Sequence, residues 1–347
     1  MSTPEQSAAP SAATGALKAS VVIPTKNPGP IFRQVLTAVC SQDTPFDYDV
    51  LVVDSGSTDG SVEFVRDFAD PRVRLLQIPP TEFGHGKTRN LAVASTTGEY
   101  AAVITHDALP ADAHWLRAMV QTADADPRIA GVFGRHIAYP SASPYTQRDL
   151  VGHFNNFSAE PVVALDDRER YDRDETYRQR LHFFSDNNAL LRRSVWEAHP
   201  YPDVDFAEDQ IWAKQIIEAG WKKAYCADGV VYHSHDYALF EKLQRSFDES
   251  YALHRLFGYV LSPGILHMLK SCIGHTVNDL RYAKHTGMLR THRRTVARMP
   301  FDNLARALGH YLGSRADRLP VRLRNWLSRD RRLLLGLPMA GGGAKQR

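Results

Sequence analysis

Residues 50–60, with the sequence VLVVDSGSTDG, constrain the fold of this chain more than any other segment. Four apolar residues in a row, at positions 50–53, are typical of a parallel strand that is covered on both faces. Asp54 follows at the carboxyl end of this predicted strand, where a carboxylate must reach solvent or a ligand because burying it unpaired is costly. Ligands of open α/β sheets bind beyond the carboxyl ends of the strands, so Asp54 is a candidate binding residue. The alternative is an ordinary turn from strand to helix, in which Ser57 or Thr58 caps the next helix.

Strands and helices alternate along the first two thirds of the sequence, which predicts an α/β fold with a doubly wound, mainly parallel sheet flanked by helices. The length of 347 residues suits one large domain with an appendage, or two domains. The densely charged segment 166–176 is expected to be a mobile loop near the active site, although a solvated surface face explains it equally well. The predicted strands lie at residues 19–25, 50–53, 73–78, 100–104, 129–133, 182–191 and 221–231.

The composition limits the class of protein. No uninterrupted apolar run approaches the roughly 20 residues of a membrane-spanning helix, so we do not expect an integral membrane protein. The cysteines Cys40, Cys226 and Cys272 lie far apart without metal-ligand spacing, which indicates reduced core residues of a cytosolic protein. Residues 1–18 lack the basic and apolar regions of a signal peptide and are expected to be a disordered leader, and residues 336–347 a disordered tail.

A glycine-punctuated loop places Lys87 and Arg89 at the start of a predicted helix. The N-terminus of a helix together with two cations suits an anion such as a diphosphate. The alternative is a plain loop with solvated charges.

Asp107 follows the strand 100–104 and is expected near Asp54 at the same edge of the sheet. A carboxylate, the phosphate oxygens of a substrate and one further ligand commonly hold Mg²⁺ or Mn²⁺. The alternative is that Asp107 caps a helix beginning near Ala111.

Two pairs of polar residues near the end of the predicted sheet are further candidates. Glu208 and Asp209 lie in the first turn of a predicted helix, where they either supply a general base or simply complement the helix dipole. His233 and His235 follow the last strand at i and i+2, so their side chains point the same way in extended chain. This arrangement suits contact with a metal or a phosphate.

The basic residues are concentrated at the C-terminal end. Residues 281–347 contain 16 Lys or Arg and 3 Asp or Glu, a net charge of +13 in a chain of net +3, which leaves −10 for the remainder. Residues 238–335 have helical patterns, and arginines fall among Trp326 and Leu327. A basic amphipathic helix with an aromatic anchor predicts contact of residues 290–335 with an anionic membrane surface. A helical cap or a homo-oligomer contact is the alternative, above all for 238–281, and nucleic acid is not expected because stacking aromatic residues are not interleaved with the cations.

Together these residues resemble the inverting family 2 glycosyltransferases, which use nucleotide sugars and have the GT-A fold, and the resemblance covers residues 20–237. It implies a GT-A domain over 19–237 and a helical basic region over 238–335. It also implies that Asp209 of the Glu208–Asp209 pair is the catalytic base. The metal motif of the family is Asp-x-Asp, and here Thr105-His-Asp lacks the first aspartate, so Asp107 with His233 or His235 is left to bind Mg²⁺ or Mn²⁺.

The resemblance also assigns donor and acceptor residues. The expected acceptor-binding residues are Asn187, Asn188 and Trp212. The expected donor-binding residues lie in four loops at the carboxyl edge of the sheet: Pro24, Thr25 and Asn27; Asp54, Ser55 and Gly56; His85, Lys87 and Arg89; and Thr105, His106 and Asp107.

Segments 83–90, 187–193 and 232–235 look like those of bacterial rhamnosyltransferases that build O-antigen or capsule. This resemblance implies dTDP-L-rhamnose as the donor, a lipid-linked or polysaccharide acceptor, and a cytoplasmic protein attached peripherally to the inner face of the cell membrane. A family 2 transferase that uses a UDP- or GDP-sugar is one alternative. The other is a sugar-nucleotide or glycan binding protein that has lost catalysis, because the first aspartate of the metal motif is missing.

Overall fold

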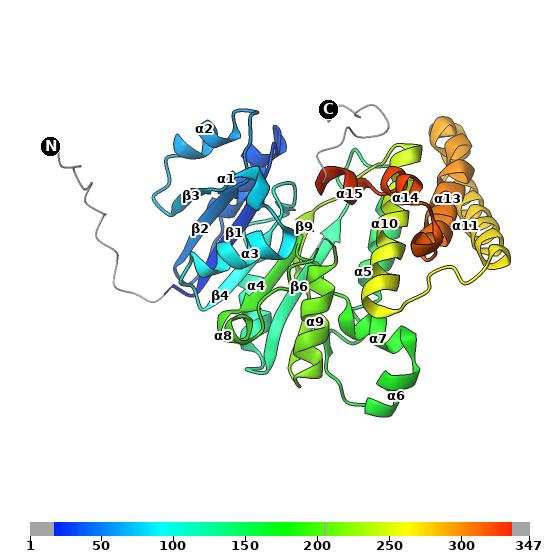
Figure 1. The fold of residues 1–347 in the computed structure, drawn as a ribbon. Coiled ribbons are helices and arrows are strands. Elements are labelled where there is room, and N and C mark those ends of the chain that lie inside the picture. Colours follow the sequence, from blue (N-terminus) through cyan, green and yellow to red (C-terminus); the bar gives the residue numbers. More distant parts are fainter. Residues whose placement is uncertain (1–16, 205, 335–347) are drawn as a thin grey trace.

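A computed structural model describes residues 17–204 and 206–334, which Figure 1 traces from the N-terminal strands to the C-terminal helices. The predicted tail at 336–347 and most of the predicted leader lie outside the described residues. Leu17 and Lys18 are described, and their carbonyl oxygens accept hydrogen bonds from the main-chain N–H groups of Glu99 and Tyr100. The sheet therefore already holds these last two residues of the predicted leader.

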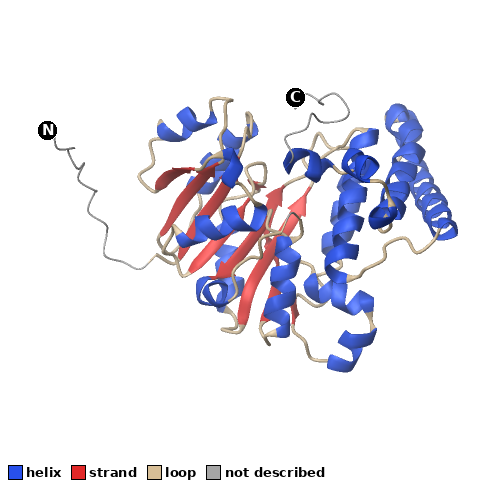
Figure 2. Cartoon of the chain, in the orientation of Figure 1, coloured by secondary structure: helices blue, strands red, loops and turns tan. Residues whose placement is uncertain are grey.

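Nine strands of the described chain form one sheet, in the order β3-β2-β1-β4-β8-β6-β9-β5, with β7 paired to β9 (Figure 2). The first four strands in this order are mutually parallel, and β6 is parallel to β9. Strand β8 is antiparallel to both of its neighbours. The strands are β1 (Ala19–Thr25), β2 (Tyr48–Asp54), β3 (Val73–Gln77), β4 (Tyr100–Ile104), β5 (Leu109–Pro110), β6 (Ile129–Ile137), β7 (Val162–Val163), β8 (Asn188–Arg192) and β9 (Lys222–Tyr232).

Helices cover both faces of this sheet (Figure 2). Residues of β2 alternate between two cores: Val50 and Val52 pack in the core that includes α1 and α4, whereas Leu51 and Val53 pack in the core that includes α3 and α9. The apolar run of β2 is buried for this reason, and the predicted α/β fold is confirmed. Within the first 232 residues the helices are α1 (Ile31–Cys40), α2 (Ser61–Arg66), α3 (His85–Ala94), α4 (Trp115–Asp124), α5 (Pro144–Asn155), α6 (Arg168–Arg173), α7 (Glu175–His182), α8 (Arg193–Ala198) and α9 (Glu208–Glu218).

The C-terminal region is helical, as predicted. Helix α10 packs along α13, and α11 packs against α13 on the side of the molecule away from β2 and β3 (Figure 1). The last strand ends at Tyr232 and the C-terminal helices begin at Leu239. The boundary of the catalytic domain at residue 237 stays a prediction. None of the described helices is both long and apolar enough to cross a membrane. The elements are α10 (Leu239–Phe257), α11 (Ile265–His285), α12 (Met288–Thr291), α13 (Arg293–Gly313), α14 (Val321–Leu327) and α15 (Arg329–Leu334).

The charged segment 166–176 forms helices instead of the expected mobile loop. Helix α6 and the start of α7 carry exposed ion pairs one turn apart, such as Arg168 with Asp172 and Arg170 with Asp174. Tyr171 is buried beneath them. The segment is therefore a solvated helical surface, which was the alternative interpretation of its charge.

Candidate active site

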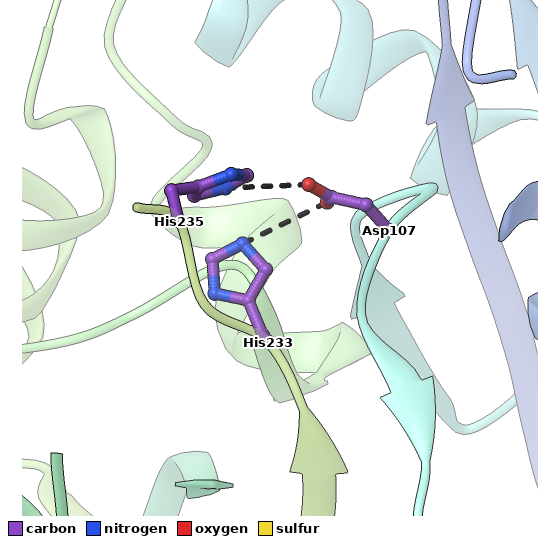
Figure 3. Close-up of side chains that lie close together, drawn as sticks. All are labelled: Asp107, His233 and His235. Atoms are coloured by element: carbon purple, nitrogen blue, oxygen red, sulfur yellow. Dashed lines mark ion pairs between the residues drawn. The ribbon is translucent and has the colours of Figure 1, made fainter. Parts of the chain in front are cut away.

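Asp107, His233 and His235 lie close together at the carboxyl edge of the sheet (Figure 3). The Nε2 atom of His235 lies 3.3 Å from Oδ2 of Asp107, and that of His233 lies 3.7 Å from Oδ1. One ligand atom from each residue lies within 4.8 Å of the other two. Strand β5 explains this approach, because it follows Asp107 directly and pairs antiparallel with the last residues of β9.

The continuation of β6 supports both halves of this cluster. The Tyr139 hydroxyl donates to the carbonyl oxygen of Asp107 at 2.9 Å, and the Tyr139 N–H donates to Oγ of Ser234 at 3.0 Å. The N–H of His233 donates to the carbonyl of Ile137. These two hydrogen bonds of Tyr139 hold the backbone segments that carry Asp107, His233 and His235. Nothing in the sequence predicted them.

The protonation states of the cluster suit a metal ion. Burial lowers the pKa of His233 to about 4 and also lowers the pKa of His235, although the charge of Asp107 opposes both shifts. Burial would raise the pKa of Asp107, but the nearby histidines and the hydroxyl of Thr105 together outweigh burial, so that pKa is lowered. Neutral imidazoles and an ionised carboxylate are the forms that bind metals. The residues present therefore fit a divalent cation.

A second cluster of buried side chains surrounds Arg89. Its Nη1 atom donates to Oε1 of Glu208 at 2.8 Å, and its Nε atom lies 3.1 Å from Oδ2 of Asp186. The Tyr201 hydroxyl donates to the other oxygen of Asp186 at 2.6 Å. Three elements thus meet at one buried cation: helix α3, the loop before β8 and the first turn of α9.

Asp209 lies at the edge of this cluster and is half-buried. Its carboxylate accepts hydrogen bonds from its neighbour Gln210 at 2.7 Å and from the main-chain N–H of Asp186 at 3.3 Å. Burial and the charges of Asp186 and Glu208 raise the pKa of Asp209, and Arg89 only partly opposes them. A carboxylate with a raised pKa is a stronger base, which is the property that proton abstraction requires.

The cluster corrects two expectations from the sequence. Arg89 was expected to contact the donor diphosphate, but its side chain is only 9% exposed and its charge is neutralised by two carboxylates. Glu208 was expected to be a catalytic residue, but its side chain is buried and forms an ion pair with Arg89. We therefore regard both as positioning residues for the first turn of α9. Lys87 in the same turn of α3 as Arg89 is exposed, so its donor contact stays a prediction.

Arg89→Met is expected to lower the free energy of unfolding by about 3–5 kcal/mol, because two carboxylates then remain buried without their cation. Denaturant unfolding of the purified protein measures this loss. Arg74→Met is a matched control, since Arg74 is 48% exposed in its ion pair with Asp49 and should change stability by less than about 1 kcal/mol. Equal, small losses in both variants would show that the buried pairs contribute little.

The loops after β1 and β2 are tied to each other. Oδ1 of Asn27 accepts from the N–H of Thr58, and Oγ of Ser57 accepts from the N–H of Asn27. Helix α2 begins at Ser61, and its N-cap is Gly60 in the left-handed conformation, so the expected cap by Ser57 or Thr58 is wrong.

Asp54 is buried, and both of its carboxylate oxygens accept from the Ser57 N–H, so its position does not by itself require a ligand. The hydroxyls of Thr25 and Ser55 are also buried and donate to main-chain carbonyls of the neighbouring strand. These three side chains stabilise the loops through these hydrogen bonds, and their donor contacts stay predictions. The donor contacts of the surrounding residues stay predictions: Pro24, Asn27, Gly56, His85, Thr105 and His106.

The model of the family described as "Glycosyl transferase family 2" matches residues 20–199. The chain is also 35% identical over 235 residues to the O-antigen chain rhamnosyltransferase RfbN of Salmonella typhimurium, an alignment that covers 67% of this chain and 71% of that protein. This chain belongs to glycosyl transferase family 2. The chain is also 29% identical to the O-antigen chain rhamnosyltransferase WbaN of Salmonella anatum, over 66% of this chain and 70% of that protein.

A solved structure shows the same fold. The mannosyltransferase PcManGT from Pyrobaculum calidifontis, in complex with GDP-Man and Mn²⁺, matches 86% of this chain and 88% of its own, with a TM-score of 0.56 and 19% identity. The GT-A fold that the sequence resemblance implied is therefore confirmed.

Two of the expected acceptor residues of this family 2 chain are buried in its core. Trp212 is fully buried, packs against the rings of Phe184 and Tyr201, and donates its indole N–H to the carbonyl of His199. Asn188 is fully buried and bonded to Trp115 and Gly229. Neither side chain can reach an acceptor, so these assignments are wrong, whereas Asn187 is partly exposed and stays a prediction.

The structure adds Asp186 to the candidate residues. This residue stands in the polar run Ser-Asp-Asn-Asn between two apolar segments, a signal that was visible in the sequence. Because β8 is antiparallel, its amino end, and not its carboxyl end, lies beside the end of β4. Asp186 therefore reaches the same edge of the sheet as Asp107.

Proposed function

We propose that this family 2 glycosyltransferase is an inverting rhamnosyltransferase that moves L-rhamnose from dTDP-L-rhamnose onto a lipid-linked or polysaccharide acceptor in cell-surface glycan synthesis. The observation that carries the proposal is the metal-ligand cluster Asp107–His233–His235 on an edge of the sheet that also presents Asp209. The choice of sugar is supported by the names of the relatives RfbN and WbaN. A lipid-linked acceptor would place the enzyme in the cytoplasm, at the inner face of the cell membrane.

On the donor side, Asp107, His233 and His235 would hold Mg²⁺ or Mn²⁺. When bound, such an ion neutralises negative charge that develops on a departing nucleoside diphosphate. Two imidazole ligands favour Mn²⁺, because Mg²⁺ prefers oxygen ligands. The exposed Lys87 at the start of α3 and the main-chain N–H groups of that turn offer further positive charge for the diphosphate.

On the acceptor side, Asp209 takes the proton of the acceptor hydroxyl while the hydroxyl oxygen attacks the anomeric carbon. The bond from this carbon to the diphosphate breaks on the opposite face as the new glycosidic bond forms, so the configuration inverts and dTDP leaves with the electron pair. The main-chain N–H of Asp186 donates to Asp209, and burial together with the charges of Asp186 and Glu208 raises the pKa of Asp209 against the opposing charge of Arg89. The chain thus supplies a base and a site for the leaving group from separate elements.

A donor screen tests the proposal. We expect kcat/KM for dTDP-L-rhamnose to exceed that for UDP-hexoses and GDP-mannose by about 100-fold, measured as nucleoside diphosphate released with Mn²⁺ or Mg²⁺ present. Preference for a UDP- or GDP-sugar would contradict the assigned donor. Binding of nucleotides without turnover of any donor would identify a sugar-nucleotide binding protein instead.

A further inference from the structure

Helix α11 presents a face of large apolar side chains that no described part of the chain covers. Of its 21 residues only Met268, Asp279 and Ala283 are buried. At 100° per residue the exposed apolar residues fall within an arc of about 120°. They are Ile265, Leu266, Leu269, Ile273, Val277 and Leu280, with exposed fractions from 38% to 70%.

Cations lie along one side of this apolar arc, with Lys284 inside its edge and Lys270 and Arg281 just beyond it. Lys270, Arg281 and Lys284 are exposed, and within the described part of the chain Arg281 bonds only the neutral side chain of Asn278, while neither lysine has a carboxylate partner. The only acidic residue of α11, Asp279, is buried and bonded to Arg148 and Asn303. From α11 to the end of α13, residues 265–313 contain 8 Lys or Arg and 2 Asp.

We propose that α11 is a membrane-docking helix that lies on an anionic lipid surface with its apolar arc in the interface. A basic helix with one apolar face binds in this way, because the cations attract anionic headgroups while the apolar side chains leave water. A second copy of the chain fits less well. Two α11 helices meeting across a symmetric interface would bring their cations together without an exposed acidic residue of α11 to pair with them.

This location differs from the one expected from the sequence. Contact with the membrane was predicted for residues 290–335, whereas a packed cap or an oligomer contact was the alternative above all for residues 238–281, which include most of α11. In the structure α13 packs against both α10 and α11. Helix α14 does expose Trp326, but that ring also packs on Phe240, with the ring centres 4.6 Å apart. The larger uncovered apolar face belongs to α11. The membrane-docking proposal rests on the proposed function only in expecting a lipid-linked acceptor.

Flotation of the full chain with vesicles tests the proposal. We expect binding to phosphatidylglycerol vesicles at low salt, much weaker binding to phosphatidylcholine vesicles, and release at high salt. Leu266→Ser with Ile273→Ser should weaken binding by about tenfold or more, since two apolar anchors are lost. Lys270→Gln with Arg281→Gln should weaken binding to the anionic vesicles by roughly 25-fold, at about fivefold for each cation.

Two controls locate the surface. Val151→Ser removes a side chain that is 51% exposed on α5 and should leave binding unchanged. Trp326→Ala should likewise have little effect, and a loss confined to that variant would place the docking surface on α14. Release of nucleoside diphosphate in vesicle-free solution should be normal in all the α11 variants, so failure of the membrane proposal and failure of the donor proposal give different results.

Three outcomes would overturn the proposal. The first is equal vesicle binding by wild type and both double variants, and the second is no preference for anionic lipid at low salt. The third is a wild-type dimer that does not bind vesicles and that Leu266→Ser with Ile273→Ser converts to monomers in sedimentation velocity, because α11 would then be an interface between two copies of the chain.

Discussion

Asp209→Asn is expected to lower kcat by about 10²- to 10⁴-fold while the affinity for dTDP stays nearly unchanged. The amide keeps the shape of the side chain but cannot take the proton of the acceptor hydroxyl. Because the pKa of Asp209 is raised, this base becomes protonated at a higher pH than an ordinary carboxylate does. As the pH falls, kcat/KM of the wild-type enzyme should therefore decline before the pH reaches the usual pKa range of carboxylates. This acid limb should be absent from the residual activity of the variant.

Turnover and dTDP affinity must be measured on the same preparations, by nucleoside diphosphate release and by calorimetry. Asp228→Asn is a suitable control, because it neutralises an exposed carboxylate on β9 away from the buried cluster. A comparable loss of dTDP affinity in Asp209→Asn would place Asp209 in the donor site. Retention of full kcat would remove it from the mechanism.

Asp107→Asn is expected to remove most turnover, by about 100-fold or more in kcat/KM, with the fold intact. The amide lacks the negative charge of the one carboxylate in the cluster, so it attracts and coordinates a divalent cation weakly. The Asp107 side chain is 21% exposed, so we expect the substitution to change the free energy of unfolding only slightly. Circular dichroism and the unfolding midpoint check that the variant is folded.

Excess chelator should reproduce the effect of Asp107→Asn in the wild-type enzyme. Adding chelator to the variant should then lower kcat/KM little further, since both changes act on the same site. Full activity in the variant, or in the wild type with excess chelator, would eliminate the metal mechanism.

Much of the site could be predicted because it depends on local pattern and one rule of topology. The apolar run at residues 50–53 indicated a strand buried on both faces, and the structure confirms it. Asp107 and His233 are far apart in the sequence, yet each follows a strand whose carboxyl end meets the same edge of the sheet. The rule placed each of them at the sheet edge, and the resemblance to family 2 grouped them as metal ligands; the structure brings them together.

The errors arose where a side chain's neighbours come from distant segments. Helical periodicity showed that Trp212 lies on an apolar face of α9, but only the packing of that face against Phe184 and Tyr201 shows that it is inaccessible. Arg89 looked like a donor contact because its partners, Asp186 and Glu208, are far from it in sequence. The role of Asp186 further depends on β8 running antiparallel, which follows from pairing across the whole sheet and not from any local pattern.

Direct Mn²⁺ binding tests most directly whether Asp107, His233 and His235 hold the cation of the donor diphosphate. Electron paramagnetic resonance of free Mn²⁺ during a titration reports binding without any need for turnover. We predict about one Mn²⁺ per chain in the presence of dTDP, weaker binding without the nucleotide, and loss of binding in the His233→Ala, His235→Ala double variant. Unchanged Mn²⁺ affinity in that variant, with the fold preserved, would contradict the assignment of the site.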